Sequence, residues 1–445
     1  MQNIYQQAPI LYKLAHHVSD FHRIELPKKT KHQAKRVLLD TLGVAIYGAK
    51  TSLHKLAVQA TIREYAADNC LVWGINDSLC ATGAAFFNSL AASTTDFDDG
   101  HRVAAGHPAS LVVPVALAVG KKTQSTMDEV LLAIVAGYEI GTRFSAARDF
   151  SCVETFSSGR WGAFASTTCA AILLKLSAQQ IIHALSLSAL LCPKMLGGHV
   201  DVSSGSMAKE GVAWAAQIGV HTAFLAKNGF FGPYLFLDEN KEYNHNILLS
   251  KLKKTWHIDG NYFKPYACCR WIHPAIDACL EIKRKYKIQF NQIQNVEIDT
   301  FNRILNLAQN RRPINSPQAQ FNLPFCVASA LFYDNLLPCH VADDVLKNEQ
   351  ILFLASKMIF RANKDFDKMF PENIPCRVTI KTPNRDFKSR IVDRPKWSAE
   401  NPATDNELYE KFRQLVGNDG RLVWDSIFQE KVKTAEDFEK LIRKL

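Results

Sequence analysis

Residues 161–174 read WGAFASTTCAAILL, and residues 211–226 read GVAWAAQIGVHTAFLA. A third stretch of the same kind, ATGAAFFNSLAAS, occupies residues 81–93. Small side chains on every side of a helix let neighbouring helix axes approach closely, and a helix without a polar face is buried all round. These three stretches therefore predict a compact multi-helix domain with a buried central layer.

Helical periodicity continues on both sides of these stretches, through roughly the first half of the chain. The segment that ends at Gly48 has one apolar face, which is typical of an amphipathic helix. Thr126 with Glu129, and Ser177 with Gln180, have the spacing of capping boxes. We therefore expect helices to begin at both of these pairs.

The pattern changes in the second half of the chain. NVEIDTF (295–301) and CRVTIKT (376–382) alternate between apolar and polar residues, as half-buried strands do. NELYEKFRQLV (406–416) returns to helical spacing and is expected to pack back onto the first domain. Since 445 residues exceed the size of one hydrophobic core, we predict a mainly α fold, with a large all-helical domain and a smaller α/β domain.

Composition excludes several classes of protein. The formal net charge is +10, but the Lys and Arg residues are scattered and form no aromatic-basic module, which argues against a nucleic-acid partner. The longest apolar stretches, such as LVVPVALAVG (111–120), are shorter than the roughly 20 residues of a membrane span. The N-terminus lacks the pattern of a signal peptide, and eleven cysteines without a C-x-x-C pair favour a reducing compartment. We therefore expect a cytoplasmic protein without a membrane partner.

The densest group of charged residues is DFDDGHRVAAGHP (96–108), which lies between two apolar stretches. Charged groups are costly beside buried segments unless they bind or catalyse something, so an active site is expected here. A solvated loop in which Asp96 or Asp98 caps a helix is the simpler alternative. A metal site made from Asp96, Asp98, His101 and His107 is a further alternative, which no H-x-x-x-H or EF-hand spacing supports.

Two later segments carry further candidate groups. In SSGSMAKEGVAWAAQIG (203–219), Lys209 is expected in the first turn of a buried helix, where it is either held by an anion or has a depressed pKa. The alternative is a lysine whose ammonium reaches the surface. In KPYACCRWIHPAID (264–277), Arg270 and His273 precede a helix that Pro274 can open, and a histidine at such a place can simply be a cap.

Other catalytic signatures are missing. The chain has no G-x-G-x-x-G after a strand, no G-x-x-x-x-G-K-[ST] and no G-x-S-x-G, which disfavours dinucleotide, nucleotide and serine-hydrolase chemistry. The remaining carboxylate, imidazole and ammonium groups suit proton transfer at a carbon next to a carboxylate. Elimination of water, loss of carbon dioxide and inversion of a stereocentre all need that chemistry.

These segments, together with LLDTLGVAIYG (38–48), GFFGP (229–233) and NPATDNELYEKF (401–412), resemble the MmgE/PrpD family, which includes 2-methylcitrate dehydratase and cis-aconitate decarboxylase. The resemblance implies a helical domain built from residues 1–265 and 399–445 and an α/β lid domain over residues 266–398. It also implies a homodimer that acts on small polycarboxylates without a metal or organic cofactor.

Carried over by position, the resemblance implies a catalytic set of one carboxylate, two imidazoles and one ammonium: Asp96, His107, Lys209 and His273. The substrate carboxylates are expected to be bound by nearby imidazole and guanidinium groups: His101, Arg102, Arg160 and Arg270.

This chain departs from the decarboxylase pattern at three places. Gly100 stands where the decarboxylase has a threonine, Phe156 where the family has a histidine, and Phe325 where the lid has a tyrosine. The spacing from Asp96 to His107 is also one residue longer. Each lost hydrogen-bond donor to developing charge is worth about 2.7 to 4 kcal/mol, so itaconate formation is disfavoured. Dehydration of a 2-methylcitrate-like substrate is the leading prediction. Decarboxylation, epimerisation of an imino or amino dicarboxylate, and non-catalytic binding are the alternatives.

Overall fold

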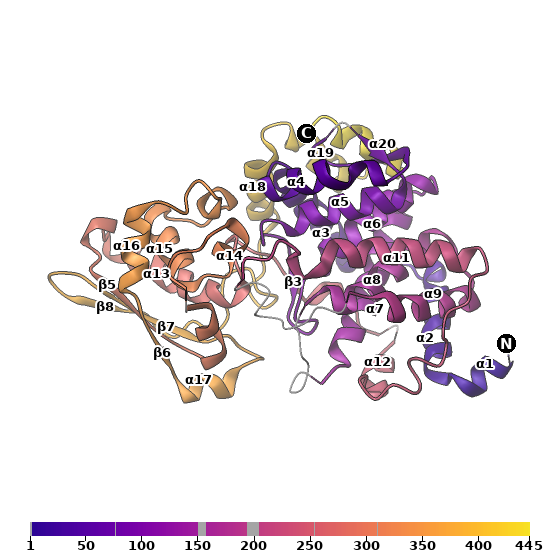
Figure 1. Ribbon diagram of the computed structural model, residues 1–445, viewed down its shortest axis with the longest axis horizontal. Helices are drawn as coiled ribbons and strands as arrows, with labels where there is room; N and C mark the ends of the chain where they lie inside the picture. The colour runs from indigo at the N-terminus through magenta and orange to yellow at the C-terminus, as the bar shows by residue number, and fades with distance from the viewer. Residues whose placement is uncertain (1, 76, 150–156, 194–203, 253, 309) are drawn as a thin grey trace.

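The computed structural model describes residues 2–75, 77–149, 157–193, 204–252, 254–308 and 310–445. The structure has two lobes, a large helical one and a smaller one with a sheet, and the chain is mainly α-helical (Figure 1). This confirms the fold class expected from the sequence.

The large lobe contains the following helices from the first part of the chain: α1 (Gln2–Gln7), α2 (Pro9–Ser19), α3 (Lys28–Gly48), α4 (Ser52–Thr61), α5 (Ala81–Ser93), α6 (Ala109–Lys122), α7 (Met127–Ala146), α8 (Gly159–Leu173), α9 (Ala178–Leu191), α11 (Val212–Lys227) and α12 (His245–Leu249). Helix α3 ends at Gly48 as expected, and both expected capping boxes are present at the starts of α7 and α9. Two short antiparallel ladders, which the sequence did not predict, pair β1 (Ala67–Leu71) with β2 (Ser78–Leu79) and β3 (Gly100–His101) with β4 (Asn261–Tyr262).

The small-residue helices form the centre of the large lobe. Helix α8 packs against both α7 and α11, and α11 also packs against α5. Helices α5 and α8 are almost entirely buried, whereas α11 also exposes Trp214 and His221. The predicted buried layer is therefore present, with α11 at its edge.

Close approach of α8 and α11 depends on Gly219. A Cβ atom at this position would lie 2.6 Å from the backbone carbon of Ser166 and 2.6 Å from the backbone nitrogen of Thr167. Because backbone atoms cannot rotate away, Gly219→Ala is expected to push the helices apart and to destabilise the fold by about 1–3 kcal/mol. Urea unfolding followed by circular dichroism measures this cost. His221→Ala, on the exposed side of the same helix, is the control, and equal unfolding midpoints for the two variants would contradict the prediction.

The C-terminal segment returns to the large lobe. It forms α18 (Asp405–Val416), α19 (Gly420–Phe428) and α20 (Ala435–Ile442). Helices α18 and α19 pack against α3, and α20 packs against α6 (Figure 1). Lys411 of α18 forms a buried ion pair of 2.8 Å with Asp40 of α3, and its ammonium also donates to the carbonyl oxygen of Phe97 at 2.7 Å. The C-terminal segment therefore directly contacts residues 96–108, which we call the acidic segment.

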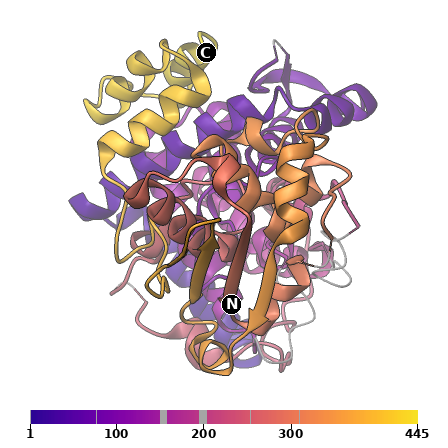
Figure 2. The same ribbon diagram turned by 90° about the vertical axis from the view of Figure 1, so that its left-hand side faces the viewer.

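The small lobe is a four-stranded sheet with helices. Its elements are α13 (His273–Tyr286), β5 (Asn295–Thr300), α14 (Ser316–Gln320), α15 (Leu323–Tyr333), α16 (Glu349–Lys357), β6 (Ile359–Ala362), α17 (Lys364–Met369), β7 (Cys376–Lys381) and β8 (Asp386–Lys388). The strand order is β6-β5-β7-β8, with β5 parallel to β6 and the other pairs antiparallel (Figure 2). Residues of β5 and β7 alternate between buried and half-buried, which confirms both predicted strands. We keep the division at residues 265/266 and 398/399 as a proposal for the domain boundaries.

In the described part of the chain, no helix is long and apolar enough to cross a membrane.

Phe156, one of the three departures from the family pattern, lies outside the described residues.

Candidate active site

The β3–β4 ladder holds the acidic segment against the residues that lead into the small lobe, which we call the lid. Since β4 ends at Tyr262, the chain places Lys264 beside Asp96. The Lys264 ammonium donates to the backbone carbonyl oxygen of Asp96 and to its Oδ2, both at 3.0 Å. Lys264 is fully buried, and although burial alone would lower its pKa, Asp96 and Asp98 raise it above the ordinary value. It is therefore a permanent cation under the acidic segment.

Asp96 is a buried carboxylate held as an anion. Its backbone has a φ of 50°, and its side chain is only 4% exposed. Burial on its own would raise the pKa of Asp96, but the charges of Lys264, Lys209 and His107 outweigh burial and hold the pKa well below its usual range. Asp96 is therefore ionised at neutral pH and is a weak base.

Lys209 lies on the other side of Asp96. Its ammonium is 3.8 Å from Asp96 Oδ1 and donates to Gln320 Oε1 at 2.7 Å. The sequence placed Lys209 in the first turn of a helix, but the structure places it before α11, in a short 3-10 turn, with a φ of 44°. Of the two expectations for a buried lysine, the structure shows the one in which an anion holds it. Because an ammonium has three donors and Gln320 accepts one, Lys209 keeps hydrogen-bonding capacity for a ligand.

His107 joins the same group. Its Nδ1–H donates to the carbonyl oxygen of Asp99 at 2.7 Å and lies 3.6 Å from Asp98 Oδ2. Its Nε2 therefore points the other way, 3.9 Å from Asp96 Oδ1 and 4.0 Å from Glu210 Oε1. Burial would lower the pKa of His107, but Asp98, Glu210 and Asp96 together raise it above 6.5. The imidazole is thus oriented by its backbone bond and favours the protonated form.

Glu210 is a carboxylate that sequence reasoning did not single out. Its φ of 60° turns the side chain back toward Ser158, whose backbone N–H and hydroxyl donate to Oε2 at 2.9 and 2.7 Å. A Cβ at residue 159 would lie 2.6 Å from the Glu210 carbonyl oxygen, so this turn needs Gly159. The side chains of Glu210 and His107 are 23% and 13% exposed, so solvent reaches the group from their side.

Asp99 anchors the segment. Its carboxylate accepts from the backbone N–H of Ala109 at 3.1 Å, from the Asn261 amide at 3.0 Å and from the Tyr138 hydroxyl. Burial raises the pKa of Asp99 to about 7, a shift that its hydrogen bonds reduce and the neighbouring Asp98 increases. The carboxylate therefore ties the acidic segment to α6, α7 and β4.

His101 has a supporting position. Its Nε2–H donates to the carbonyl oxygen of His257 at 2.9 Å, and its Nδ1 accepts from the backbone N–H of Ala104 at 3.2 Å. With both ring nitrogens used in this way, the ring is neutral. Burial and the nearby His257 lower its pKa to about 3. His101 thus holds the turn between the two halves of the acidic segment.

His273 and Arg270 are bonded to each other at the base of the lid. Arg270 donates to His273 Nδ1 at 3.1 Å and to the carbonyl oxygen of Lys396 at 3.0 Å, and His273 Nε2–H donates to the Cys268 carbonyl oxygen at 3.2 Å. Burial, followed by the charge of Arg270, lowers the pKa of His273 well below 6.5. His273 is close enough to Lys264 and Asp96 for their charges to influence it, although its hydrogen bonds go elsewhere.

The other two predicted arginines are directed away from this group. Arg102 donates to the Glu372 carbonyl oxygen at 2.8 Å and to the Glu400 carboxylate, so it joins the acidic segment to the lid. Arg160 is paired with Glu242 at 2.9 Å. Their predicted roles in substrate binding stay predictions.

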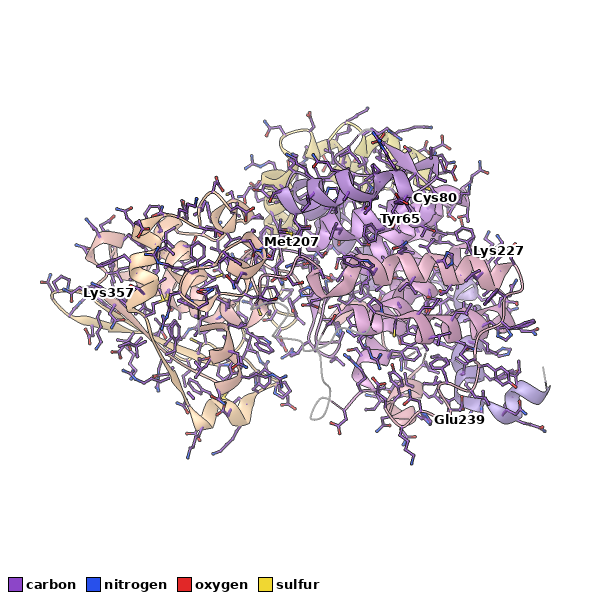
Figure 3. The ribbon with its side chains drawn as sticks, viewed as in Figure 1. Tyr65, Cys80, Met207, Lys227, Glu239 and Lys357 are labelled. Carbon is purple, nitrogen blue, oxygen red and sulfur yellow. The ribbon has the colours of Figure 1, made fainter. Side chains whose placement is uncertain are left out.

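The structure therefore brings together Asp96, His107 and Lys209 and adds Lys264 and Glu210. His273 lies near enough for Lys264 and Asp96 to affect its pKa, but its hydrogen bonds go elsewhere. The catalytic roles of all four predicted residues stay predictions. Met207, next to the Lys209 turn, lies where the two lobes meet (Figure 3). Lys264 begins the segment 264–277, and Glu210 directly follows Lys209. No sequence pattern marks either residue as part of the site, because only the fold shows which charge faces Asp96 or His107. Among the residues described, no three His, Cys, Asp or Glu side chains are arranged to hold a metal ion.

The chain is similar to known proteins over most of its length. Residues 12–252 match the MmgE/PrpD N-terminal domain, and residues 266–422 match the MmgE/PrpD C-terminal domain. The chain is 25% identical over 440 residues to a cis-aconitate decarboxylase of Aspergillus terreus, with 91% of this chain and 89% of the relative covered. It is 23% identical over 449 residues to the cis-aconitate decarboxylase of Homo sapiens, with 93% and 89% covered. Both domain models and these full-length matches lead to one conclusion: the chain belongs to the MmgE/PrpD family.

Proposed function

We propose that this protein decarboxylates a small unsaturated polycarboxylate of the cis-aconitate type without a cofactor. The observation that carries the proposal is the contrast between Asp96 and His107. Asp96 is held ionised, which makes it a weak base, whereas the raised pKa of His107 makes it a proton donor. Decarboxylation needs a proton donor and cations but no proton abstraction from carbon, and that is the set of groups assembled here.

The proposed reaction uses residues on the solvent side of the group. A retained substrate carboxylate binds to the Lys209 ammonium, which has donors beyond its bond to Gln320. The bond to the departing carboxylate breaks, its electron pair shifts into the adjacent unsaturated system, and carbon dioxide leaves. His107 Nε2 then gives its proton to carbon, and a proton from solvent restores the imidazolium. Lys264, being buried, positions Asp96 rather than touching the substrate.

Tyr262 lies next to Gly100, the residue that stands where the decarboxylase has a threonine. A Cβ at Gly100 would lie 2.2 Å from the Tyr262 hydroxyl oxygen, so this phenol occupies the space that a side chain at residue 100 would need. Burial raises the pKa of Tyr262 to about 12, which keeps the hydroxyl protonated. The Tyr262 hydroxyl is therefore a neutral hydrogen-bond donor beside Gly100. It can replace the threonine hydroxyl whose absence argued against decarboxylation. Phe325, in contrast, is buried in α15 and supplies no donor.

Dehydration, the leading prediction from the sequence, is the second candidate. It needs a base for a carbon-bound proton as well as an acid for the leaving hydroxide. Glu210 Oε1, 4.0 Å from His107 Nε2 and partly exposed, supplies a carboxylate at a suitable place. The homodimer implied by the family resemblance also stays a prediction.

The experiment is a reaction in D2O with cis-aconitate as the first substrate and 2-methylcitrate and citrate as the others. We expect one equivalent of carbon dioxide for each cis-aconitate consumed, and one solvent deuteron on carbon in the product. Mass spectrometry and headspace gas analysis measure both. Loss of water from the hydroxy acids without carbon dioxide would favour dehydration. Deuterium exchange without net loss would indicate an epimerase, and binding without any exchange would indicate a non-catalytic protein.

A further inference from the structure

A basic groove lies outside the candidate active site, on the side of the lid that faces the C-terminal helices. Its volume is about 610 Å³, within the range of about 300–1,000 Å³ typical of small-molecule sites. Five cationic side chains line it: Arg284, Lys285, Arg390, Arg394 and Lys396. The acidic side chains that line it are Asp277 and Glu281. The lining is therefore positive by three charges.

The two carboxylates neutralise little of this charge. Asp277 is directed into the wall, where one oxygen accepts from the Tyr266 hydroxyl at 2.7 Å and the other from the backbone N–H of Lys396 at 2.8 Å. Glu281 lies 3.6 Å from Arg390, and both side chains are more than half exposed. Exposed pairs of this kind contribute about 0–1 kcal/mol, so Arg390 is available to a better partner.

Of the remaining cations, two have no carboxylate partner among the described residues and two have one. In the described part of the chain, Arg284 and Lys285 form no ion pair with a carboxylate, and both are exposed. Arg394 is 3.9 Å from Glu400, and Lys396 is 3.2 Å from Glu407. Arg394 also donates to Asn373 at 3.2 Å. Like charges that line one groove repel one another, and an anion between them reduces that repulsion.

The groove joins two parts of the chain. Arg284 and Lys285 lie in the last turn of α13 in the lid, whereas Arg394 and Lys396 belong to the segment that leads to α18. That same segment supports the candidate active site, because the carbonyl oxygen of Lys396 accepts from Arg270, which holds His273. A second cavity of about 430 Å³ shares Tyr266, Arg284 and Lys396 and extends to Phe97 and Lys411, behind the acidic segment.

We propose that this groove binds a small polyanion with two or more phosphate or carboxylate groups, separately from the substrate. Guanidinium groups match the paired oxygens of both kinds of anion, and Arg284, Arg390 and Arg394 offer three of them within one groove. The ligand bridges the lid and the segment that carries Lys396.

The test is calorimetric titration of the full chain at low ionic strength with sodium pyrophosphate in one arm and tricarballylate in the other. The variant is Arg284→Ala/Arg390→Ala, two exposed positions whose replacement is expected to leave the fold intact. Lys55→Ala/Arg63→Ala removes the same charge from exposed positions on the large lobe and is the control.

We expect the wild type and the control to bind at least one of the two anions alike, and the groove variant to bind it at least about tenfold more weakly. Binding of pyrophosphate alone assigns a phosphate ligand, and groove-dependent binding of tricarballylate alone assigns a polycarboxylate. No binding of either anion by the wild type, or equal binding by the groove variant, overturns the proposal. Tricarballylate resembles the proposed substrate, so only the part of its binding that the groove variant loses is assigned to the groove. That difference does not depend on which reaction the active site performs.

Discussion

Lys264→Met is expected to lower the rate of turnover at least about 100-fold, because Asp96 loses the cation that holds both its carboxylate and its backbone carbonyl. The substitution also leaves a buried carboxylate with Lys209, 3.8 Å away, as its nearest cation. Removing one partner of a buried ion pair costs about 3–5 kcal/mol. Steady-state kinetics and urea unfolding measure the two effects.

The loss of stability in Lys264→Met is expected to depend on pH. The pKa of Asp96 is held below its ordinary value of 3.8, so its ionic contacts stabilise the wild type above pH of about 4. This contribution is lost as the pH falls from there toward the lower folded pKa. The difference in stability between wild type and Lys264→Met should therefore shrink in acid. Lys368→Met, which removes an exposed lysine paired with Asp365, is the control. A variant as stable as this control at pH 7 would show that Asp96 does not need Lys264.

His107→Asn is expected to reduce turnover by about 10²–10⁴-fold while the protein stays folded. The amide nitrogen of asparagine takes the place of Nδ1 and can still donate to the Asp99 carbonyl oxygen, which holds His107 at 2.7 Å. The group that is lost is Nε2, which faces Asp96 and Glu210. The substitution thus removes the proton donor and keeps the bond that orients it.

The pH profile separates this role from a structural one. Because the acid form of His107 is proposed to react and its pKa is raised above 6.5, kcat/KM of the wild type should fall as the pH rises through that pKa. His107→Asn should lack this limb. His101→Asn, which loses the bond from Nε2 to the His257 carbonyl oxygen, should lower stability and keep the limb. An unchanged pH profile in His107→Asn would exclude His107 as the proton donor.

Local signals in the sequence were sufficient for many elements. The capping boxes at Thr126 and Ser177 satisfy backbone N–H groups within four residues, so they act whatever the rest of the chain does. Strands β5 and β7 follow from a two-residue alternation. The sequence placed Lys209 in the first turn of a helix, but α11 begins only at Val212. The left-handed backbone at Lys209 and Glu210 is maintained by contacts with distant residues, among them Ser158.

For the candidate active site, the sequence indicated several of the residues but not which residues would contact one another. The cost of charged groups next to apolar helices singled out the segments that contain Asp96, His107 and Lys209, and the family resemblance then picked these three residues. The sequence did not single out Lys264, whose importance lies in two bonds to Asp96, 168 residues away in the chain. Nor did it predict that Arg102 would join the lid to the acidic segment, or that His273 would be neutral between Arg270 and Cys268.

By itself, the sequence determined the fold class, the capped starts of α7 and α9, the strands β5 and β7, and which charged segments needed an explanation, because periodicity, capping and burial cost act over a few residues. Only the tertiary structure decided which charged side chains contact one another in the candidate active site. The β3–β4 ladder sets Lys264 under Asp96, and the turn at Glu210 sets a carboxylate beside His107. Electrostatic energy in a buried site depends on distances of a few ångströms between residues far apart in the chain, and those distances exist only once the helices have packed.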